Sequence, residues 1–164
     1  MYDIDDKDRV LERQDIPPSD SGAPMPVLCA DEDRRCVLAY YCPPHDVVDA
    51  LDHVIVTLHA IAHYFGGPND EALNEHPLYA RGLRSYGIFE IENSSWIRTL
   101  EVRNRVHPHH DPQRFRHLKH FVFTFHDSLF EAILSDVHWT RWGGDRKDLF
   151  PEMTRRLLDL PRPS

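Results

Sequence analysis

Hydrophobic residues recur at three- and four-residue steps between positions 47 and 65, and this spacing predicts one long amphipathic helix. The residues that set the pattern are Val47, Val48, Leu51, Val54, Ile55, Leu58, Ile61, Ala62 and Phe65. Asp46 is a suitable N-cap for this helix, and the Gly-Gly-Pro sequence at 66–68 is a typical helix stop. We therefore expect a core helix at about 46–65.

Two pairs of short apolar runs predict β-hairpins. The first pair, residues 27–30 and 36–42, flanks a charged turn. The second pair, residues 120–126 and 129–134, is separated by the polar dipeptide Asp127-Ser128. A strand followed by a helix is the alternative for the second pair, because Asp and Ser are also good helix caps.

The remaining ordered segments predict one more strand and two shorter helices. Residues 86–91 are rich in β-branched and aromatic side chains, and Ser94 or Ser95 can cap a helix that runs on to about Val106. A strand at 96–102 is the alternative for this segment. Residues 149–160 carry apolar side chains at helical spacing. The expected fold is α+β, with a single domain at 25–160 in which a mostly antiparallel sheet of about five strands packs on one long helix and one or two shorter helices.

The net charge of −8 lies almost entirely at the start of the chain. Residues 1–33 hold ten acidic and three basic residues, so the rest of the chain is close to neutral. The first residues are also rich in proline and poor in large apolar side chains, so they bury too little surface to offset the entropy of ordering. We expect residues 1–24 to form an acidic, disordered tail.

The sequence lacks the patterns of several protein classes. No apolar stretch approaches the length of a membrane span, and the start lacks the basic and apolar regions of a signal peptide. The three cysteines have no paired spacing that would indicate a disulfide framework. A Gly-rich phosphate loop is also missing. These features predict a cytoplasmic protein that contacts no membrane and binds no nucleotide cofactor through such a loop.

Seven of the twelve histidines lie between residues 107 and 138. Histidine is the commonest metal ligand and titrates near neutral pH, so such a cluster can be a metal site, a pH sensor or a hydrated surface loop. His107, His109 and Asp111 occupy alternate positions and would point the same way in an extended segment. These three are the candidate ligands of a divalent metal, Zn²⁺ or Fe²⁺.

His126, Asp127 and Glu131 are the candidates for general acid–base catalysis. In the predicted hairpin Glu131 lies near the turn beside His126, and a carboxylate that orients a histidine makes it a suitable base. Ordinary hydrogen bonds at the end of a strand are the structural alternative. No nucleophile in a recognisable motif accompanies the three residues.

A third set of candidates suits an anionic ligand. Residues 69–84 form a polar loop, and between residues 98 and 119 six basic residues oppose two acidic ones. The ligand-binding candidates in these segments are Tyr79, Arg81, Arg84, Arg98 and Arg105. For the loop at 69–84 the favoured alternative is structural, with Leu78, Tyr79 and Leu83 attaching it to the core. Because the chain as a whole is acidic and its arginines are scattered, we expect no binding of nucleic acid. The acidic first residues are an alternative partner for the basic segment.

Two functions follow from these observations. The first is a non-catalytic binding or regulatory module, self-associating as a homo-oligomer, whose histidine- and arginine-rich segment meets a small anionic ligand or a protein partner. The second is a small hydrolase or lyase with a histidine and carboxylate site, with or without a metal. The enzyme requires its candidate residues to surround one cleft, namely His107, His109, Asp111, His126 and Glu131.

Overall fold

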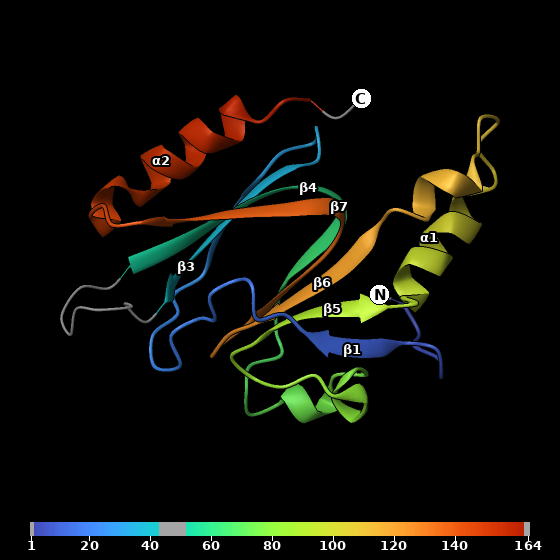
Figure 1. Cartoon of the computed structure of the whole chain (residues 1–164), viewed down its shortest axis with the longest axis horizontal. Coiled ribbons are helices and arrows are strands. Elements are labelled where there is room, and N and C mark those ends of the chain that lie inside the picture. The colour runs from blue at the N-terminus through green and yellow to red at the C-terminus, as the bar shows by residue number, and fades with distance from the viewer. Residues whose placement is uncertain (1, 43–51, 163–164) are drawn as a thin grey trace.

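The computed structural model describes residues 2–42 and 52–162, and within these ranges the chain forms one seven-stranded antiparallel sheet with two α-helices (Figure 1). The strand order is β1-β5-β6-β7-β4-β3-β2. The strands are β1 Arg9–Glu12, β2 Val27–Ala30, β3 Arg35–Cys42, β4 Asp52–Gly66, β5 Ile88–Glu92, β6 Lys119–Thr124 and β7 Leu129–Trp142. The helices are α1 Ser95–Asn104 and α2 Arg146–Asp159, and the short 3₁₀-helices are η1 Leu73–Glu75, η2 Tyr79–Arg81 and η3 Pro112–Phe115. None of the helices in the described ranges is long and apolar enough to cross a membrane.

The two longest strands, β4 and β7, pair with each other along most of their length and organise the sheet. β3 pairs with residues 52–59 of β4, whereas β6 pairs with residues 129–134 of β7. Because β4 and β7 are antiparallel, these two segments lie at opposite ends of the pair. Register shifts between Leu58 and Ala62 separate the two ends, and such irregularities bend a strand.

The sheet curves strongly enough for strands that are not neighbours to share one core. The ring of Tyr40 on β3 lies 6.3 Å from that of Phe123 on β6 and 5.4 Å from that of Phe125, although β4 and β7 separate the two strands in the sheet. Neighbouring strands are about 4.8 Å apart, so positions three strands apart in a flat sheet would be separated by about 14 Å. The concave face therefore encloses the largest apolar cluster.

The convex face is covered by two separate units (Figure 1). The α2 helix covers β2, β3 and β4, where Leu149 and Met153 pack in one apolar cluster with Ile55. The segment that carries η1 and η2 covers β5 and β6, where Leu78 and Leu83 pack with Val122. The two ends of the β4–β7 pair thus have different covers.

The helix predicted at 46–65 is wrong. Asp52–Gly66 is the strand β4, and residues 46–51 lie outside the described residues. The first half of β4 is buried on both faces, so its apolar residues run almost continuously and fit a helical spacing as well as a strand. The consecutive β-branched residues Val54, Ile55 and Val56 favour the strand. The fold is accordingly dominated by a seven-stranded sheet with two short helices, and not by about five strands on one long helix.

The elements with strong local signals are confirmed. β2 and β3 form the first predicted hairpin, and β6 and β7 form the second, which excludes the alternative helix from residue 129. The predicted strand at 86–91 corresponds to β5, and the helix after Ser94 to α1, for which the Ser94 hydroxyl accepts a hydrogen bond from the N–H of Ile97. The predicted C-terminal helix corresponds to α2.

Residues 2–24, expected from composition to be a disordered tail, pack against the sheet in the structure. β1 pairs with β5 at one edge, and Ile16 is 1 % exposed within the concave core. The hydroxyl of Tyr40 donates a hydrogen bond of 2.7 Å to the carbonyl of Pro17. A few buried side chains such as Ile16 anchor this segment, and the average composition of residues 2–24 does not reveal them.

The packing of this segment predicts that Ile16→Ala destabilises the protein by about 2–5 kcal/mol, because a fully buried isoleucine leaves a cavity in the core. Ile61→Ala is the matched control, since the Ile61 side chain is 41 % exposed, and it should cost less than about 1 kcal/mol. Urea denaturation of both variants measures the difference. Equal, small losses would show that residues 2–24 do not pack as described.

Candidate functional site

A cluster of buried polar side chains surrounds the carboxylate of Glu131 on the convex face. We call it the Glu131 cluster, and its members are Tyr2, His76, Ser94, Trp96, His120 and Glu131. Glu131 of β7 lies opposite Val122 of β6, and His120 lies two residues from Val122, so both polar side chains point to the same face. The other members come from the first residues of the chain, the loop after η1 and the start of α1.

One carboxylate oxygen collects the hydrogen bonds of this cluster. Oε1 of Glu131 accepts a hydrogen bond of 3.0 Å from the hydroxyl of Tyr2 and lies 3.2 Å from Nε2 of His76. Nδ1 of His76 accepts a hydrogen bond from the N–H of Leu78, so the ring proton is on Nε2, which donates to Glu131. The loop backbone thereby fixes the tautomer of His76.

His120 approaches the same carboxylate from β6. Its Nε2 lies 3.8 Å from Oε1 of Glu131, beyond hydrogen-bond distance, and its Nδ1 lies 2.9 Å from the hydroxyl of Ser94. Its ring is nearly perpendicular to the rings of Tyr2 and Trp96, at centroid distances of 5.4 and 5.3 Å. Tyr2 and Trp96 are themselves stacked at 5.1 Å with an interplanar angle of 8°.

The environment keeps Glu131 ionised. Burial alone would raise the pKa of Glu131, but the nearby side chains of His120 and His76, with the hydrogen bond from His76, outweigh burial and lower this pKa to about 2. Burial, reinforced by the charge of Glu131, raises the pKa of the Tyr2 phenol above its ordinary value. At neutral pH, Tyr2 is therefore a hydrogen-bond donor and Glu131 an acceptor.

Two buried atoms of the cluster have no hydrogen-bond partner among the residues that the structure describes. They are Oε2 of Glu131 and Nε2 of His120, and both side chains are fully buried. Most buried polar atoms in proteins are paired, and leaving one unpaired costs roughly 1–3 kcal/mol. The cluster thus retains one acceptor and one ring nitrogen that the Tyr2 hydroxyl does not engage.

The Glu131 cluster is poorly arranged for a metal ion, although two histidines and one glutamate are a common ligand set. The Nε2 of His76 carries the proton and cannot also offer a lone pair. Within residues 2–42 and 52–162, no group of three histidine, cysteine, aspartate or glutamate side chains is placed to hold a metal.

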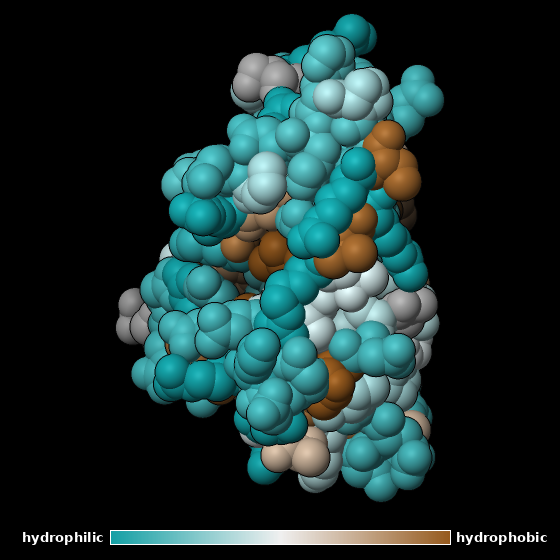
Figure 2. Space-filling model, turned by 90° about the vertical axis from the view of Figure 1, so that its right-hand side faces the viewer, coloured by the Kyte–Doolittle hydropathy of each residue, from teal (hydrophilic) through white to brown (hydrophobic). Residues whose placement is uncertain are grey.

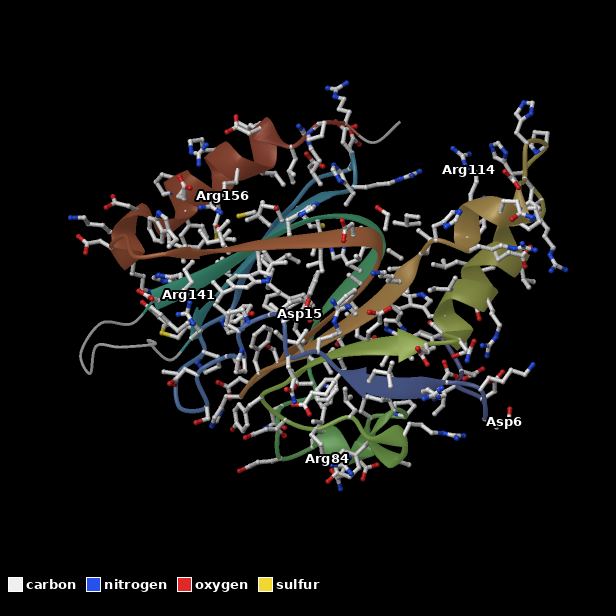
Figure 3. The ribbon with its side chains drawn as sticks, viewed as in Figure 1. Asp6, Asp15, Arg84, Arg114, Arg141 and Arg156 are labelled. Atoms are coloured by element: carbon white, nitrogen blue, oxygen red, sulfur yellow. The ribbon has the colours of Figure 1, made fainter. Side chains whose placement is uncertain are left out.

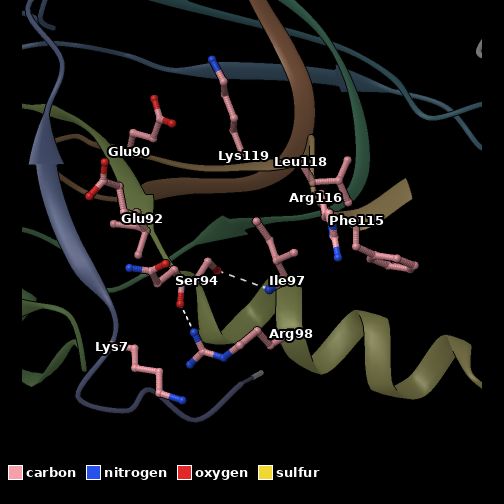
Figure 4. Close-up of a pocket in the computed structure, with 12 residues that line it drawn as sticks. Lys7, Glu90, Glu92, Ser94, Ile97, Arg98, Phe115, Arg116, Leu118 and Lys119 are labelled. Atoms are coloured by element: carbon pink, nitrogen blue, oxygen red, sulfur yellow. Dashed lines mark hydrogen bonds between the residues drawn. The ribbon is translucent and has the colours of Figure 1, made fainter. Parts of the chain in front are cut away.

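A pocket of about 630 Å³ lies next to this cluster, between β5, the start of α1 and the chain around η3 (Figure 4). We call it the β5–α1 pocket. Its apolar wall includes Ile97, Phe115 and Leu118. Ser94 lines the pocket, and its hydroxyl forms a hydrogen bond with His120. Ser94 therefore belongs both to the wall of the pocket and to the Glu131 cluster.

Acidic side chains of the β5–α1 pocket are already neutralised by arginines from β1 and the residue that follows it. Glu92 forms an ion pair of 3.2 Å with Arg9, and Glu90 forms one with Arg13. Neither arginine lines the pocket itself. Because these two arginines already balance the two carboxylates, little negative charge remains in the pocket to balance the basic residues on its other walls.

The basic residues of the pocket are mostly unpaired. Lys7, Arg116 and Lys119 line the pocket and form no ion pair with any residue that the structure describes. Arg98 is held in place by Asp5, at 2.5 Å, and by the backbone carbonyl of Asn93. The pocket thus carries an excess of positive charge in a chain whose net charge is −8.

The predicted acid–base trio is not brought together. His126 and Asp127 lie in the turn between β6 and β7, with Nδ1 and Oδ1 3.0 Å apart, and this hydrogen bond raises the pKa of His126. Both side chains are exposed. Glu131 lies instead in the buried cluster, because the turn is centred on His126 and Asp127, with the N–H of Phe125 bonded to the carbonyl of Ser128, and not on Asp127 and Ser128 as predicted. This shift by one residue places Glu131 opposite Val122, away from His126.

The predicted metal ligands form an exposed loop between α1 and η3. Nδ1 of His107 accepts a hydrogen bond from the N–H of His109, and the two rings are 5.9 Å apart. The carboxylate of Asp111 caps η3 by accepting from the N–H of Gln113. This loop precedes β6 and His126 follows it, so the six residues of β6, about 20 Å in length, separate the two. The single cleft required by the enzyme hypothesis is not formed.

The predicted anion-binding residues divide between two places. The guanidinium of Arg84 lies 4.8 Å from the ring centre of Tyr79 and donates a hydrogen bond to the Tyr79 carbonyl. Arg81 is an exposed residue of η2 in the same loop. On α1, Arg98 lines the β5–α1 pocket, whereas Arg105 forms an ion pair with Glu101. Figure 3 shows Arg84 at the bottom of the view, whereas Arg114, next to the β5–α1 pocket, lies at the upper right.

Most members of the Glu131 cluster were not predicted from the sequence. His120 had a usable signal, because it shares a strand face with Val122, which an alternating pattern places toward the core. Tyr2 and His76 carry no such signal, because each belongs to a segment without a regular period. In the sequence, Lys119 and Arg116 contribute only to the charge balance of the basic segment at 98–119, which does not predict that they line a pocket.

Comparison of the chain with protein-family models, with curated proteins and with solved structures found no match. The function is therefore argued from the residues and their geometry.

The low pKa of Glu131 predicts a specific dependence of stability on pH. The folded pKa of about 2 is below the ordinary value of 4.5, so the stabilisation is complete above pH 4.5 and is lost as the pH falls through about 2. The wild-type protein should lose about 3 kcal/mol over this window from Glu131 alone. Glu131→Gln should remove that loss, as measured by urea denaturation at a series of pH values.

Glu32→Gln is the control for this measurement, because Glu32 is an exposed residue of the turn between β2 and β3. It should leave the pH profile of the wild-type protein unchanged. If Glu131→Gln also has the wild-type profile, the carboxylate is not held in its ionised form by the cluster.

Proposed function

We propose that the protein is a non-catalytic binding module that recognises a negatively charged group in the β5–α1 pocket. The observation that supports this proposal is the set of three pocket cations, Lys7, Arg116 and Lys119, that form no ion pair with the described residues. Cations that have no carboxylate partner and border a pocket favour a carboxylate or a phosphate.

The walls of the pocket indicate what the rest of the ligand is like. Figure 4 shows Ile97, Leu118 and Phe115 on the same side of the pocket as Arg116. A ligand that places its anionic group near Arg116 or Lys119 therefore meets apolar surface beside it. The matching chemistry is an aryl or alkyl group that bears a phosphate or a carboxylate, either as a small molecule or on a protein partner.

The surface around α1 supports a local binding site more than a broad apolar interface. Figure 2 views the molecule from the side that carries α1 and η3, and hydrophilic residues cover most of this face, with small separate hydrophobic areas between them. Val102 of α1 is 54 % exposed as one such residue. Scattered apolar residues of this kind are normal on a protein surface.

The catalytic alternative, a small hydrolase or lyase, has less support. Its carboxylate, Glu131, is fully buried under Tyr2, and its histidine, His126, belongs to an exposed turn elsewhere. A substrate would reach Glu131 only after the first residues of the chain had moved. The geometry of the β5–α1 pocket requires no such movement.

We also propose, as the sequence predicts, that the protein is cytoplasmic and self-associates. One feature that supports self-association is the outer half of β4, where residues 61–66 pair with β7 on one side and with no strand of the described residues on the other. Ile61 and Phe65 of this segment are partly exposed, at 41 and 37 %. Unpaired strand edges of this kind are sites of association between chains. Sedimentation equilibrium measures the oligomeric state.

Phenyl phosphate tests the binding proposal, because it joins an anionic group to an apolar ring. We expect saturable binding at low ionic strength, seen as NMR shift changes at Ile97, Arg116 and Lys119, and weaker binding of inorganic phosphate. A Lys119→Gln, Arg116→Gln double variant should bind phenyl phosphate at least about 10-fold more weakly, since two charge-assisted contacts are lost.

Arg114→Gln is the matched control, because Arg114 belongs to η3 but does not line the pocket. It should change the affinity less than about 2-fold. Equal losses in the control and the double variant would mean that phenyl phosphate responds to the net charge only. In that case, or with no saturable binding, the pocket is not an anion site.

A further inference from the structure

We propose that the Glu131 cluster is a binding site for a planar ring that carries a hydroxyl group, and that the side chain of Tyr2 occupies this site as a displaceable plug. The matching ligand class is a phenol, including the tyrosine side chain of a partner. This site adjoins the anion pocket, and the segment that moves includes Lys7 of the pocket wall, but the proposal does not depend on the function proposed for that pocket.

The walls of the site are built without the first residues of the chain. His76 is held by Leu78, and His120 by Ser94, which in turn caps α1. Trp96 belongs to the first turn of α1. Every wall residue thus has its own support from the sheet, the loop or the helix. We infer that removing the Tyr2 side chain leaves the walls in place.

The chemistry of the walls selects a hydroxylated ring. Trp96 stacks on one face of the Tyr2 ring, and the His120 ring meets it at 83°. Glu131 accepts the hydroxyl proton through Oε1. A ring without a hydroxyl would leave this buried carboxylate oxygen with His76 as its remaining donor, which is unfavourable in a buried site.

The unpaired atoms indicate that Tyr2 does not use the full capacity of the site. Oε2 of Glu131 and Nε2 of His120 are buried and have no partner among the described residues. A ligand with a second hydroxyl group next to the first can offer a donor to Oε2 as well. A 1,2-dihydroxy ring should therefore bind more tightly than a monohydroxy ring.

The segment that carries Tyr2 is attached more weakly than the walls. Strand pairing begins only at Arg9, so residues 2–8 contribute no strand to the sheet. Asp5 holds Arg98 through side chains that are 47 and 38 % exposed, and such ion pairs contribute little. Asp8 is the firm anchor, because its buried carboxylate accepts a hydrogen bond from the N–H of Ser95. Residues 2–7 can thus leave while Asp8 and β1 stay in place.

The first experiment uses the full chain with Tyr2→Gly, which removes the plug. We expect 4-methylphenol to bind this variant saturably and to raise its melting temperature. Toluene, which has the same ring without the hydroxyl, should bind at least about 10-fold more weakly, and 4-methylcatechol more tightly. Equal binding of toluene and 4-methylphenol would show that the site is only an apolar cavity and would overturn the proposal.

The second experiment tests displacement in the wild-type protein and does not need the variant to fold. With 3-fluorotyrosine in place of tyrosine, ¹⁹F NMR follows the Tyr2 signal, assigned from the spectrum of Tyr2→Phe. Adding 4-methylphenol should move the Tyr2 signal to that of an exposed tyrosine, with an affinity about 10- to 1,000-fold weaker than for Tyr2→Gly, because the plug competes. The signal of Tyr79, which lies outside the site, should not move.

N-acetyl-tyrosinamide separates the two sources of the phenol. Binding at least as tight as that of 4-methylphenol supports a tyrosine of a partner chain, and weaker binding supports a small free phenol. An unchanged Tyr2 signal at the highest soluble concentration of 4-methylphenol and 4-methylcatechol would show that Tyr2 is a permanent part of the core, and the proposal would then be wrong.

Discussion

The pairing of β4 with β7 is the interaction on which the rest of the structure depends. Each of these strands is more than twice the usual length, and the pair takes a further strand at each end, β3 on β4 at one end and β6 on β7 at the other. The irregular register near Ala60 bends the pair, so that β3 and β6 approach each other across the concave core. The same bend divides the convex face into one half under α2 and another half that holds the Glu131 cluster.

The half of the convex face that holds the Glu131 cluster depends on one ionised carboxylate, that of Glu131. A buried charge is tolerated only where polar groups surround it. Glu131 accepts hydrogen bonds from the first residues and from the loop after η1, and His120 of β6 lies 3.8 Å from the same oxygen. Ser94 extends this network to the wall of the β5–α1 pocket. The two candidate sites are therefore mechanically connected through the start of α1, although they suit different ligands.

The sequence predicts this fold where the signal is local and fails where it is not. The hairpins and the cap of α1 depend on residues close together in the chain, and both are found as predicted. β4 is buried on both faces in its first half, so it loses the period of two that identifies a strand. Residues 2–24 owe their order to single anchors such as Ile16, which an average over composition does not reveal.

The candidate site follows the same logic. The sequence identifies Glu131 as a candidate, but the partners of Glu131 depend on the exact position of the turn, which Asp127 and Ser128 do not determine. Moving the turn by one residue shifts the register of β6 and β7 by two residues, and this shift moves Glu131 from the neighbourhood of His126 to that of His120. In the sequence, only a local excess of basic residues indicated the basic wall of the β5–α1 pocket. Lys7 and Lys119 lie far apart in the sequence, and the fold brings both to the lining of one pocket.

The hydrogen bond between Tyr2 and Glu131 joins residues 129 positions apart. A ribosome adds about 5–20 residues per second, so Tyr2 waits roughly 6–26 s for its acceptor to be made. β5 is complete only at residue 92 and β7 follows later, so the first residues have no strand to pack against for most of this time. Their many aspartates keep them hydrated during this time, so the charge that resembles that of a disordered tail suits a segment that is made before its partners and docks after them.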